Sequence, residues 1–148
     1  MLVVDLDINI TPINIIDIEQ LRLIRNREDV WKNLSNSVLI NETEQKIWYE
    51  QQANDRSKQY YVILYKESLI GSVWYDEWDR INSSCRIGIF IKKEKVDKGI
   101  GSKVLKRFIK YLFNDLHLHR IWLLVLENNI QAIHVYEKLG FCKEGLQK

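Results

Sequence analysis

A chain of 148 residues is long enough for a buried core, and 46% hydrophobic with 28% charged residues is typical of a globular protein. The formal net charge of +2, from 22 basic and 20 acidic residues, is too balanced to indicate a nucleic-acid partner or a membrane surface. One proline and six glycines argue against disorder, so residues 1–148 are expected to form a single domain.

The amino-terminal sequence does not predict export. MLVVDLDINI carries acidic residues where a signal peptide has a basic start. No apolar run approaches the roughly 18 residues that span a bilayer. Cys85 and Cys142, the only cysteines, form no disulfide framework, so the sequence favours the reducing cytoplasm.

The first half of the chain predicts strands and amphipathic helices. Residues 6–14 alternate and are rich in β-branched side chains, which indicates a strand that ends at Pro12. Residues 15–27 have helical spacing, and Asn41 is expected to cap a further helix in a capping box with Glu44. Three strands are predicted next, the first two as a hairpin, at residues 60–67, 68–79 and 83–93.

The second half predicts a strand–helix–strand unit followed by a last helix. The helix opens near residue 100 and carries one apolar stripe, made of Ile100, Val104, Leu105, Phe108, Ile109, Leu112 and Phe113. Residues 119–127 predict a buried strand, parallel to the strand before the helix. A final helix over residues 130–139 is expected to end at Gly140, and residues 141–145 to begin one more strand.

Glycines open the central helix, in the sequence KVDKGIGSKVL. Gly99 and Gly101 cost conformational entropy there, which favours close approach of a ligand to bare backbone. Main-chain N–H groups at a helix start, with Lys98 and Lys103 nearby, suit a phosphate or pyrophosphate. A flexible turn explains the same residues about equally well. The segment matches neither the Walker pattern nor GxGxxG.

A second pattern follows in ENNIQAIHVYEKLGF, and the two together resemble the GCN5-related N-acetyltransferase (GNAT) family. The first is the family's [QR]-x-x-G-x-[GA], occupied here by Val96, Gly99 and Gly101. The second is N-x-x-A-x-x-x-Y-x-x-x-G-F, occupied by Asn129, Ala132, Tyr136, Gly140 and Phe141. The resemblance covers the whole order of elements. The first half of the chain resembles the RimJ/RimL-type and, more loosely, the amino-sugar N-acetyltransferase branches of the family.

The resemblance implies an α/β (α+β) fold of the GNAT type. The expected sheet is mixed and mostly antiparallel, with one parallel pair joined by the cofactor-binding helix and with about four flanking helices. The strand that usually completes the family's sheet is missing before Lys148. The unfilled edge of such a sheet invites pairing, so a homodimer through the C-terminal sheet edge is one expectation.

The resemblance also implies acetyl-CoA as co-substrate, and no metal. Main-chain groups of the strand before the helix would hold the pantetheine arm, at Ile89, Phe90 and Ile91. The loop into the helix would hold the pyrophosphate, at Val96, Lys98, Gly99, Ile100, Gly101 and Ser102. Asn129 would bond the pantetheine. Tyr136 would be the general acid, because a phenol with a pKa near 10 stays protonated at neutral pH and can protonate the leaving thiolate.

Three positions depart from the family pattern. Val96 replaces the usual Gln or Arg, Arg86 stands near the place of a glutamate base, and Leu124 occupies the alternative base position. The general base therefore stays open, between water and four side chains that are candidates by location: Glu127, His134, Tyr75 and Glu77.

The implied reaction is direct attack of a primary amine on acetyl-CoA in a ternary complex. The acceptor is either a protein N-terminus or a small amine such as an amino sugar, and the alternative is a non-catalytic acyl-CoA-binding module. Four aromatic residues are candidates for the acceptor pocket: Trp48, Tyr49, Tyr75 and Trp78.

Overall fold

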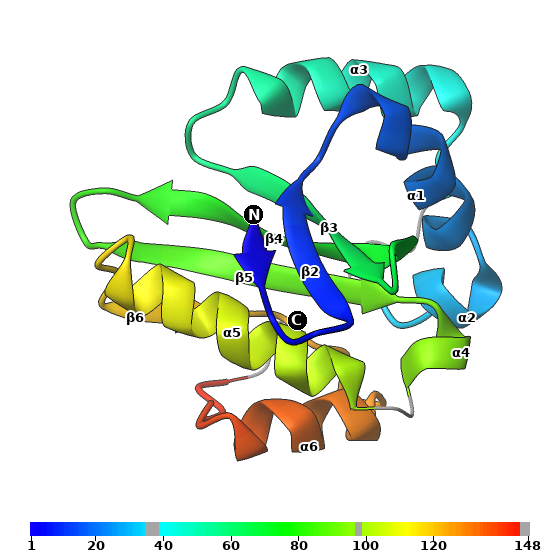
Figure 1. Ribbon diagram of the computed structural model, residues 1–148. Coiled ribbons are helices and arrows are strands. Elements are labelled where there is room, and N and C mark those ends of the chain that lie inside the picture. Colours follow the sequence, from blue (N-terminus) through cyan, green and yellow to red (C-terminus); the bar gives the residue numbers. More distant parts are fainter. Residues whose placement is uncertain (35–38, 97–98, 146–148) are drawn as a thin grey trace.

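A mixed sheet forms the centre of the molecule in the computed structural model, which describes residues 1–34, 39–96 and 99–145 (Figure 1). Over these residues the six strands lie in the order β1-β2-β3-β4-β5-β6. All neighbours are antiparallel except β5 and β6, which are parallel, as predicted. The strands are β1 (Leu2–Val3), β2 (Ile8–Pro12), β3 (Gln59–Tyr65), β4 (Ser68–Asp79), β5 (Ser84–Ile91) and β6 (Arg120–Trp122).

The helices cover both faces of the sheet, with α1, α2 and α3 on one side and α5 and α6 on the other (Figure 1). The four longest within the described residues have 8, 12, 15 and 9 residues. They are α1 (Ile18–Arg25), α3 (Glu42–Ala53), α5 (Ile100–Asn114) and α6 (Ile130–Lys138). The short helices are η1 (Ile15–Asp17), α2 (Glu28–Trp31) and α4 (Lys93–Val96).

Two hydrophobic clusters lie on the two faces of the sheet. The larger joins α5 to β2–β5, and its centre includes Phe108, Val104 and Ile10, all 0% exposed. The smaller lies under α1 and α2, where Leu21, Ile24 and Val30 pack on β3 and β4. The alternation of each strand separates the two sets, because successive side chains point to opposite faces.

Two local signals in the first half are confirmed: β2 ends at Pro12, and Asn41 is the N-cap of α3. Asn41 Oδ1 accepts a hydrogen bond from the N–H of Glu44 at 2.8 Å, but the return bond to the Glu44 side chain is not formed in the described chain, so the expected capping box is only half present. The structure adds a capping box that the sequence reading missed. The side chain of Asn14 accepts from Ile16 N–H, and Asp17 Oδ2 accepts from Asn14 N–H at 2.9 Å.

The strand predicted over residues 119–127 is much shorter than expected, since β6 has only 3 residues. Beyond Trp122 the chain leaves β5, and Leu124 is 37% exposed rather than buried. The strand predicted in residues 141–145 is also wrong, because those residues form none. Apolar composition alone cannot show where a strand loses its partner. In the described part of the chain β6 is the edge of the sheet, and a homodimer through it stays a prediction.

The last helix ends as the sequence predicts. Gly140 has a φ of 101°, in the left-handed region that favours glycine. Its N–H donates to Glu137 O at 3.0 Å, and the N–H of Phe141 donates to Tyr136 O at 3.0 Å. These two bonds make a Schellman motif, and the ring of Phe141 adds its hydrophobic contact to Tyr136, with the centroids 5.9 Å apart. The end of α6 therefore fixes the position of Tyr136.

No helix in the described parts of the chain combines the length and the apolar character that a bilayer crossing requires.

Phe108 and Phe113 provide a matched test of this core on one helix. Phe108 is 0% exposed and packs edge-on against Tyr61, whereas Phe113 is 41% exposed. We expect Phe108→Ala to lower the free energy of unfolding by about 3–5 kcal/mol, and Phe113→Ala by less than about 1 kcal/mol. Urea denaturation of the two variants would measure both. Equal losses would contradict the packing described here.

Candidate functional site

A cleft of about 500 Å³ lies where β5 and the chain after β6 separate. One part is lined by β5, the start of α5 and α6, including Ile89, Gly101 and Tyr136. It continues to the face of the sheet beneath α1 and α3, where Trp48 and Asp76 line it. Residues from both halves of the chain thus share one cavity.

The cleft exists because the parallel pairing stops early. Residues 84–86 of β5 pair with residues 120–122 of β6, and the ladder ends at Arg86 and Trp122. β5 continues to Ile91 and stays paired with β4 on its other side. Its main-chain groups that point toward residues 123–126 have no ladder partner among the described residues. Buried main-chain groups require partners, so this edge suits a ligand that can accept and donate hydrogen bonds.

The start of α5 faces the same cleft. Gly99 is the N-cap with a φ of 70°, and Gly99, Gly101 and Ser102 line the cavity. The first intrahelical bond within the described chain is from Lys103 N–H to Gly99 O, at 3.2 Å. The N–H groups of the turn before it have no acceptor within a helix, and together with the helix dipole they favour an anion.

At Gly99 and Gly101 the neighbouring side chains leave enough room for a larger residue. A Cβ at Gly99 would meet nothing within 4 Å, and one at Gly101 would make an ordinary contact of 3.6 Å with Ile91 Cδ1. The positive φ explains Gly99. Gly101 has no positive φ, so nothing within the described chain explains why it is glycine. A ligand that lies close to the main chain at this position would explain it.

The other residues that were predicted to bind the pyrophosphate, or to add positive charge beside it, do not all line the cleft. The side chain of Ile100 is 3% exposed and packs in the core, so only its main chain can serve a ligand. Val96 ends α4, and Lys98 lies outside the described residues. Lys103, expected to add positive charge, bonds the carboxylate of Asp5 through Nζ at 3.3 Å.

Asn129 and Ala132 of the second motif form the start of α6. Asn129 is the N-cap, and its Oδ1 accepts a hydrogen bond from Ala132 N–H at 3.3 Å. The spacing of these two residues therefore has a structural explanation. The side chain of Asn129 lines the cleft, and its amide N–H groups are donors that this cap does not use.

Tyr136 lies in the wall of the cleft, one helical turn beyond Ala132. Burial raises the pKa of its phenol to about 12. A phenol with that pKa carries its proton at any physiological pH. The side chain is therefore suited to donate a proton, and unsuited to accept one.

The four side chains that were candidates for the general base are not in this cleft. Glu127, His134 and Glu77 are exposed and outside its lining. Tyr75 is 8% exposed and packs in the core on the α5 face of the sheet. Burial raises its pKa to about 12, which further disfavours it as a base.

A charged pair at the base of the cleft was missed by the sequence reading. Asp76 on β4 stands opposite Arg86 on β5, and both line the cavity. Asp76 Oδ1 accepts from Arg86 Nε at 2.8 Å, and Oδ2 accepts from Nη2 at 2.6 Å. The carboxylate raises the pKa of Arg86, so the guanidinium stays charged. The pairing depends on the register of β4 against β5, which the sequence pattern does not show.

Aromatic rings form the floor of the second half of the cleft. Tyr60 stacks on Trp74 with centroids 5.3 Å apart, and Trp48 meets Tyr60 edge-on at 4.7 Å. The ring of Trp74 lies flat over Gly88, where a Cβ would come within 2.2 Å of Cζ2. Gly88 thus lets the indole lie across β5, next to the charged pair.

Of the four aromatic residues expected in the acceptor pocket, only Trp48 lines this cleft. Tyr75 and Trp78 contact each other on the opposite face, and Tyr49 is outside the lining. The bulge in β4 between Asp76 and Asp79 explains part of the difference. It lies between Trp74 and Trp78, so Trp74 lines the cleft while Trp78 packs on the other face of the sheet.

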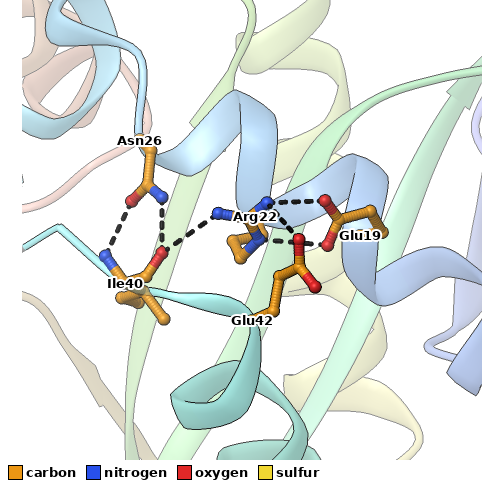
Figure 2. Close-up of polar contacts among 5 residues, drawn as sticks. All are labelled: Glu19, Arg22, Asn26, Ile40 and Glu42. Carbon is orange, nitrogen blue, oxygen red and sulfur yellow. Dashed lines mark hydrogen bonds and ion pairs between the residues drawn. The ribbon is translucent and has the colours of Figure 1, made fainter.

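The wall opposite the floor is held by contacts between α1 and the entry to α3, which Figure 2 shows. Asn26 bonds both main-chain groups of Ile40, accepting from its N–H at 2.9 Å and donating to its carbonyl at 2.6 Å. Arg22 pairs with Glu19 at 2.6 Å and reaches Glu42 at 3.7 Å. These bonds fix Ile40, which lines the cleft, and the helix that carries Trp48.

Comparison with known proteins gives a consistent result. The family model for the acetyltransferase (GNAT) domain matches residues 7–142. Spermidine N(1)-acetyltransferase of Vibrio cholerae is 34% identical over 98 residues, which are 66% of this chain and 57% of that protein. The chain therefore spans little more than half the length of that relative. Acetyltransferase PseH of Campylobacter jejuni is 26% identical over 133 residues, 90% of this chain and 82% of that protein.

A solved structure has the same fold. The crystal structure of the Vibrio cholerae spermidine N-acetyltransferase in complex with CoA and spermine superposes with a TM-score of 0.87 at 25% identity. The match covers 95% of this chain and 84% of the other.

The raised pKa of Tyr136 predicts a pH dependence of stability. The folded state holds this proton up to about pH 12, whereas the unfolded chain releases it near pH 10. The contribution to stability is therefore complete below pH 10 and is lost as the pH rises from 10 to 12. Between pH 9 and 11 we expect wild type to lose about 1 kcal/mol more free energy of unfolding than Tyr136→Phe. Urea denaturation at the two pH values tests this, and equal losses would show that the phenol is not buried.

Proposed function

The chain belongs to the GNAT acetyltransferase family, and we propose that it moves the acetyl group of acetyl-CoA to a primary amine of a small molecule. The observation that carries the proposal is the single continuous cleft. It is lined by the glycine-rich start of α5, by the aromatic floor and by Tyr136. A cavity of this form can hold a long co-substrate and an acceptor at the same time.

The co-substrate would lie along the free edge of β5. Main-chain groups of Ile89, Phe90 and Ile91 would bond the pantetheine arm, together with the amide of Asn129. The N–H groups from Gly99 to Ser102 would hold the pyrophosphate, together with Val96 at the end of α4. Support comes from the missing ladder beyond Arg86 and from the lack of any steric conflict that would require glycine at position 101.

The chemistry needs one proton donor and no covalent enzyme intermediate. The amine nitrogen attacks the thioester carbonyl, the C–S bond breaks, and the thiolate leaves. We assign Tyr136 as the general acid that protonates the departing sulfur, because its raised pKa keeps the proton on the phenol until then. Main-chain N–H groups of β5 would stabilise the oxyanion.

The acceptor proton would leave through water. Glu127, His134, Tyr75 and Glu77 lie outside the cleft, and Leu124 in its lining has no titratable group. Both carboxylate oxygens of Asp76 already accept hydrogen bonds from Arg86. A water chain along the open cleft serves the same purpose without a dedicated side chain.

A small amine is favoured over a protein N-terminus by the names of the relatives. Several are named as spermidine or spermine N-acetyltransferases, from Vibrio cholerae, Escherichia coli and Bacillus subtilis. The second candidate is a non-catalytic acyl-CoA-binding module, and the absence of an available carboxylate base in the described cleft is what favours it.

Replacing Tyr136 separates the two candidates. With acetyl-CoA and a panel of polyamines, amino sugars, amino acids and peptides, thiol release should depend on one class of acceptor. Tyr136→Phe should lower kcat by about 10²–10⁴-fold, because it removes the proton donor and little else. Its affinity for acetyl-CoA, measured by calorimetry, should change by less than about threefold. Tyr49→Phe, outside the cleft, is the matched control. An unaltered kcat in Tyr136→Phe would refute the role of the phenol.

The helix start can be tested without turnover. Gly101→Val places methyl groups where the ligand would lie, and we expect it to weaken CoA binding by about tenfold or more. Stability should hardly change, because valine costs less than glycine inside a helix. Gly101→Ala makes only the 3.6 Å contact with Ile91 and should lose much less affinity. Calorimetry with CoA and thermal unfolding give the two readouts, and full CoA affinity in Gly101→Val would place the pyrophosphate elsewhere.

A further inference from the structure

We infer that the acceptor amine carries an anionic group, a carboxylate or a phosphate, and that Arg86 binds this group. The inference rests on the proposed acetyl transfer and names the class of acceptor. The geometry that points to it is the way in which Arg86 is held, with one edge of its guanidinium fixed and the other edge available in the cleft.

Arg86 uses only part of its hydrogen-bonding capacity. A guanidinium has five N–H donors. Within the described chain, Asp76 takes Nε–H and one N–H of Nη2. The outer edge, formed by Nη1 and the second N–H of Nη2, has no partner there. The side chain is 30% exposed and lines the cleft, so this edge is accessible from the cavity.

The fixed edge prepares the other edge for binding. Asp76 is only 5% exposed and holds the guanidinium plane by two bonds, so little side-chain freedom is lost when a ligand binds. The ring of Trp122 lies 5.7 Å from the guanidinium carbon. An arginine held this way presents a planar fork that matches a carboxylate or phosphate in a two-bond arrangement.

The charge of the cleft disfavours a polycation. Two acidic residues line it, Asp76 and Asp29, and each is already paired with an arginine. Asp29 Oδ2 accepts from Arg27 at 2.9 Å, as Asp76 does from Arg86. A polyamine that enters would find no carboxylate free of a cationic partner among the described lining residues, and would add positive charge next to Arg86.

A second guanidinium lines the same cavity. Arg25 of α1 reaches the cleft from the opposite wall, and burial lowers its pKa. Two arginines therefore stand on the acceptor side of the cleft, Arg86 on β5 and Arg25 on α1.

The position of Arg86 places the anion close to the reaction. Arg86 is the last residue of β5 paired with β6, and the proposed co-substrate edge begins directly after it. An anionic group on this fork would anchor an acceptor at the point where the strands separate. Its amine would then extend along β5 toward Ile89 and the thioester.

Matched pairs of acceptors test the inference: glucosamine 6-phosphate against glucosamine, and serine against serinamide, with spermidine as the polycation. We expect wild type to prefer the anionic member by at least about tenfold in kcat/KM, since charge-assisted bonds are made to it alone. The two pairs distinguish a phosphate from a carboxylate. A neutral amine or spermidine acetylated as well as the anionic members would overturn the inference.

The matched variant is the double substitution Asp76→Asn with Arg86→Gln. It removes both charges together and avoids leaving a buried carboxylate without a partner. The preference for the anionic acceptor, taken as the ratio of kcat/KM for the anionic and neutral members of a pair within one enzyme, should fall by at least about tenfold. Because intrinsic amine basicity cancels in this comparison, an unchanged preference would overturn the role of Arg86. Arg86→Lys keeps the charge but lacks the fork, and an intermediate loss is expected.

Binding measurements separate this inference from the proposed reaction. If no acceptor is acetylated although acetyl-CoA binds, the proposed acetyl transfer fails. Calorimetry of the CoA-loaded protein with glucosamine 6-phosphate and with serine then tests the anion site by itself. Binding that the double variant loses supports the site. The absence of binding by wild type to both ligands overturns it.

Discussion

The structure depends on the point at which β5 loses its neighbour. Three residues of β5 pair with β6, and the remaining residues to Ile91 keep only the β4 partner. In a closed sheet this edge would be covered by the next strand. Here the chain after Trp122 turns away, and the edge borders a cavity of about 500 Å³. Main-chain groups at such an edge require partners, so the same departure that shortens the sheet makes a binding site.

Two helix ends complete that site, and both depend on glycine for a backbone reason. Gly99, at a φ of 70°, is the N-cap of α5, and Gly99, Gly101 and Ser102 at this helix start line the cleft. Gly140, at 101°, closes α6 with a Schellman motif that brings Phe141 against Tyr136. A helix start favours the anionic end of a ligand, and a buried phenol favours proton donation. The two helix ends thus place different chemistry in the cleft: anion binding at the start of α5 and proton donation at Tyr136.

Much of this could be predicted from the sequence, because the signals are local. Alternation and β-branching gave β2 to β5, and Asn41 and Gly140 marked helix ends by side-chain and backbone chemistry that needs no tertiary context. The length of β6 could not be predicted, since HRIWLLVLE is apolar throughout and only the position of β5 decides where pairing stops. The Asp76–Arg86 pair was missed for a related reason. It depends on the register of β4 against β5, and on a bulge before Asp79 that sequence patterns do not reveal.

The proposed co-substrate site and the proposed acceptor site depend on different kinds of chemical group. Selectivity for the acceptor amine can therefore change while the co-substrate site stays the same. The proposed co-substrate site at the edge of β5 and the start of α5 relies on main-chain groups, which a new side chain can block but does not remove. The acceptor side instead uses side chains: the rings over Gly88, the pair of Arg86 with Asp76, and Arg25 opposite. The solved structure named for spermidine N-acetyltransferase, in complex with CoA and spermine, has the same fold at a TM-score of 0.87. A cavity whose two carboxylates are both paired with arginine has no net negative charge to offer a polyamine. In the proposed function the fold supplies the acetyl-donor site, and the charges on β4, β5 and α1 would decide which amine can approach it.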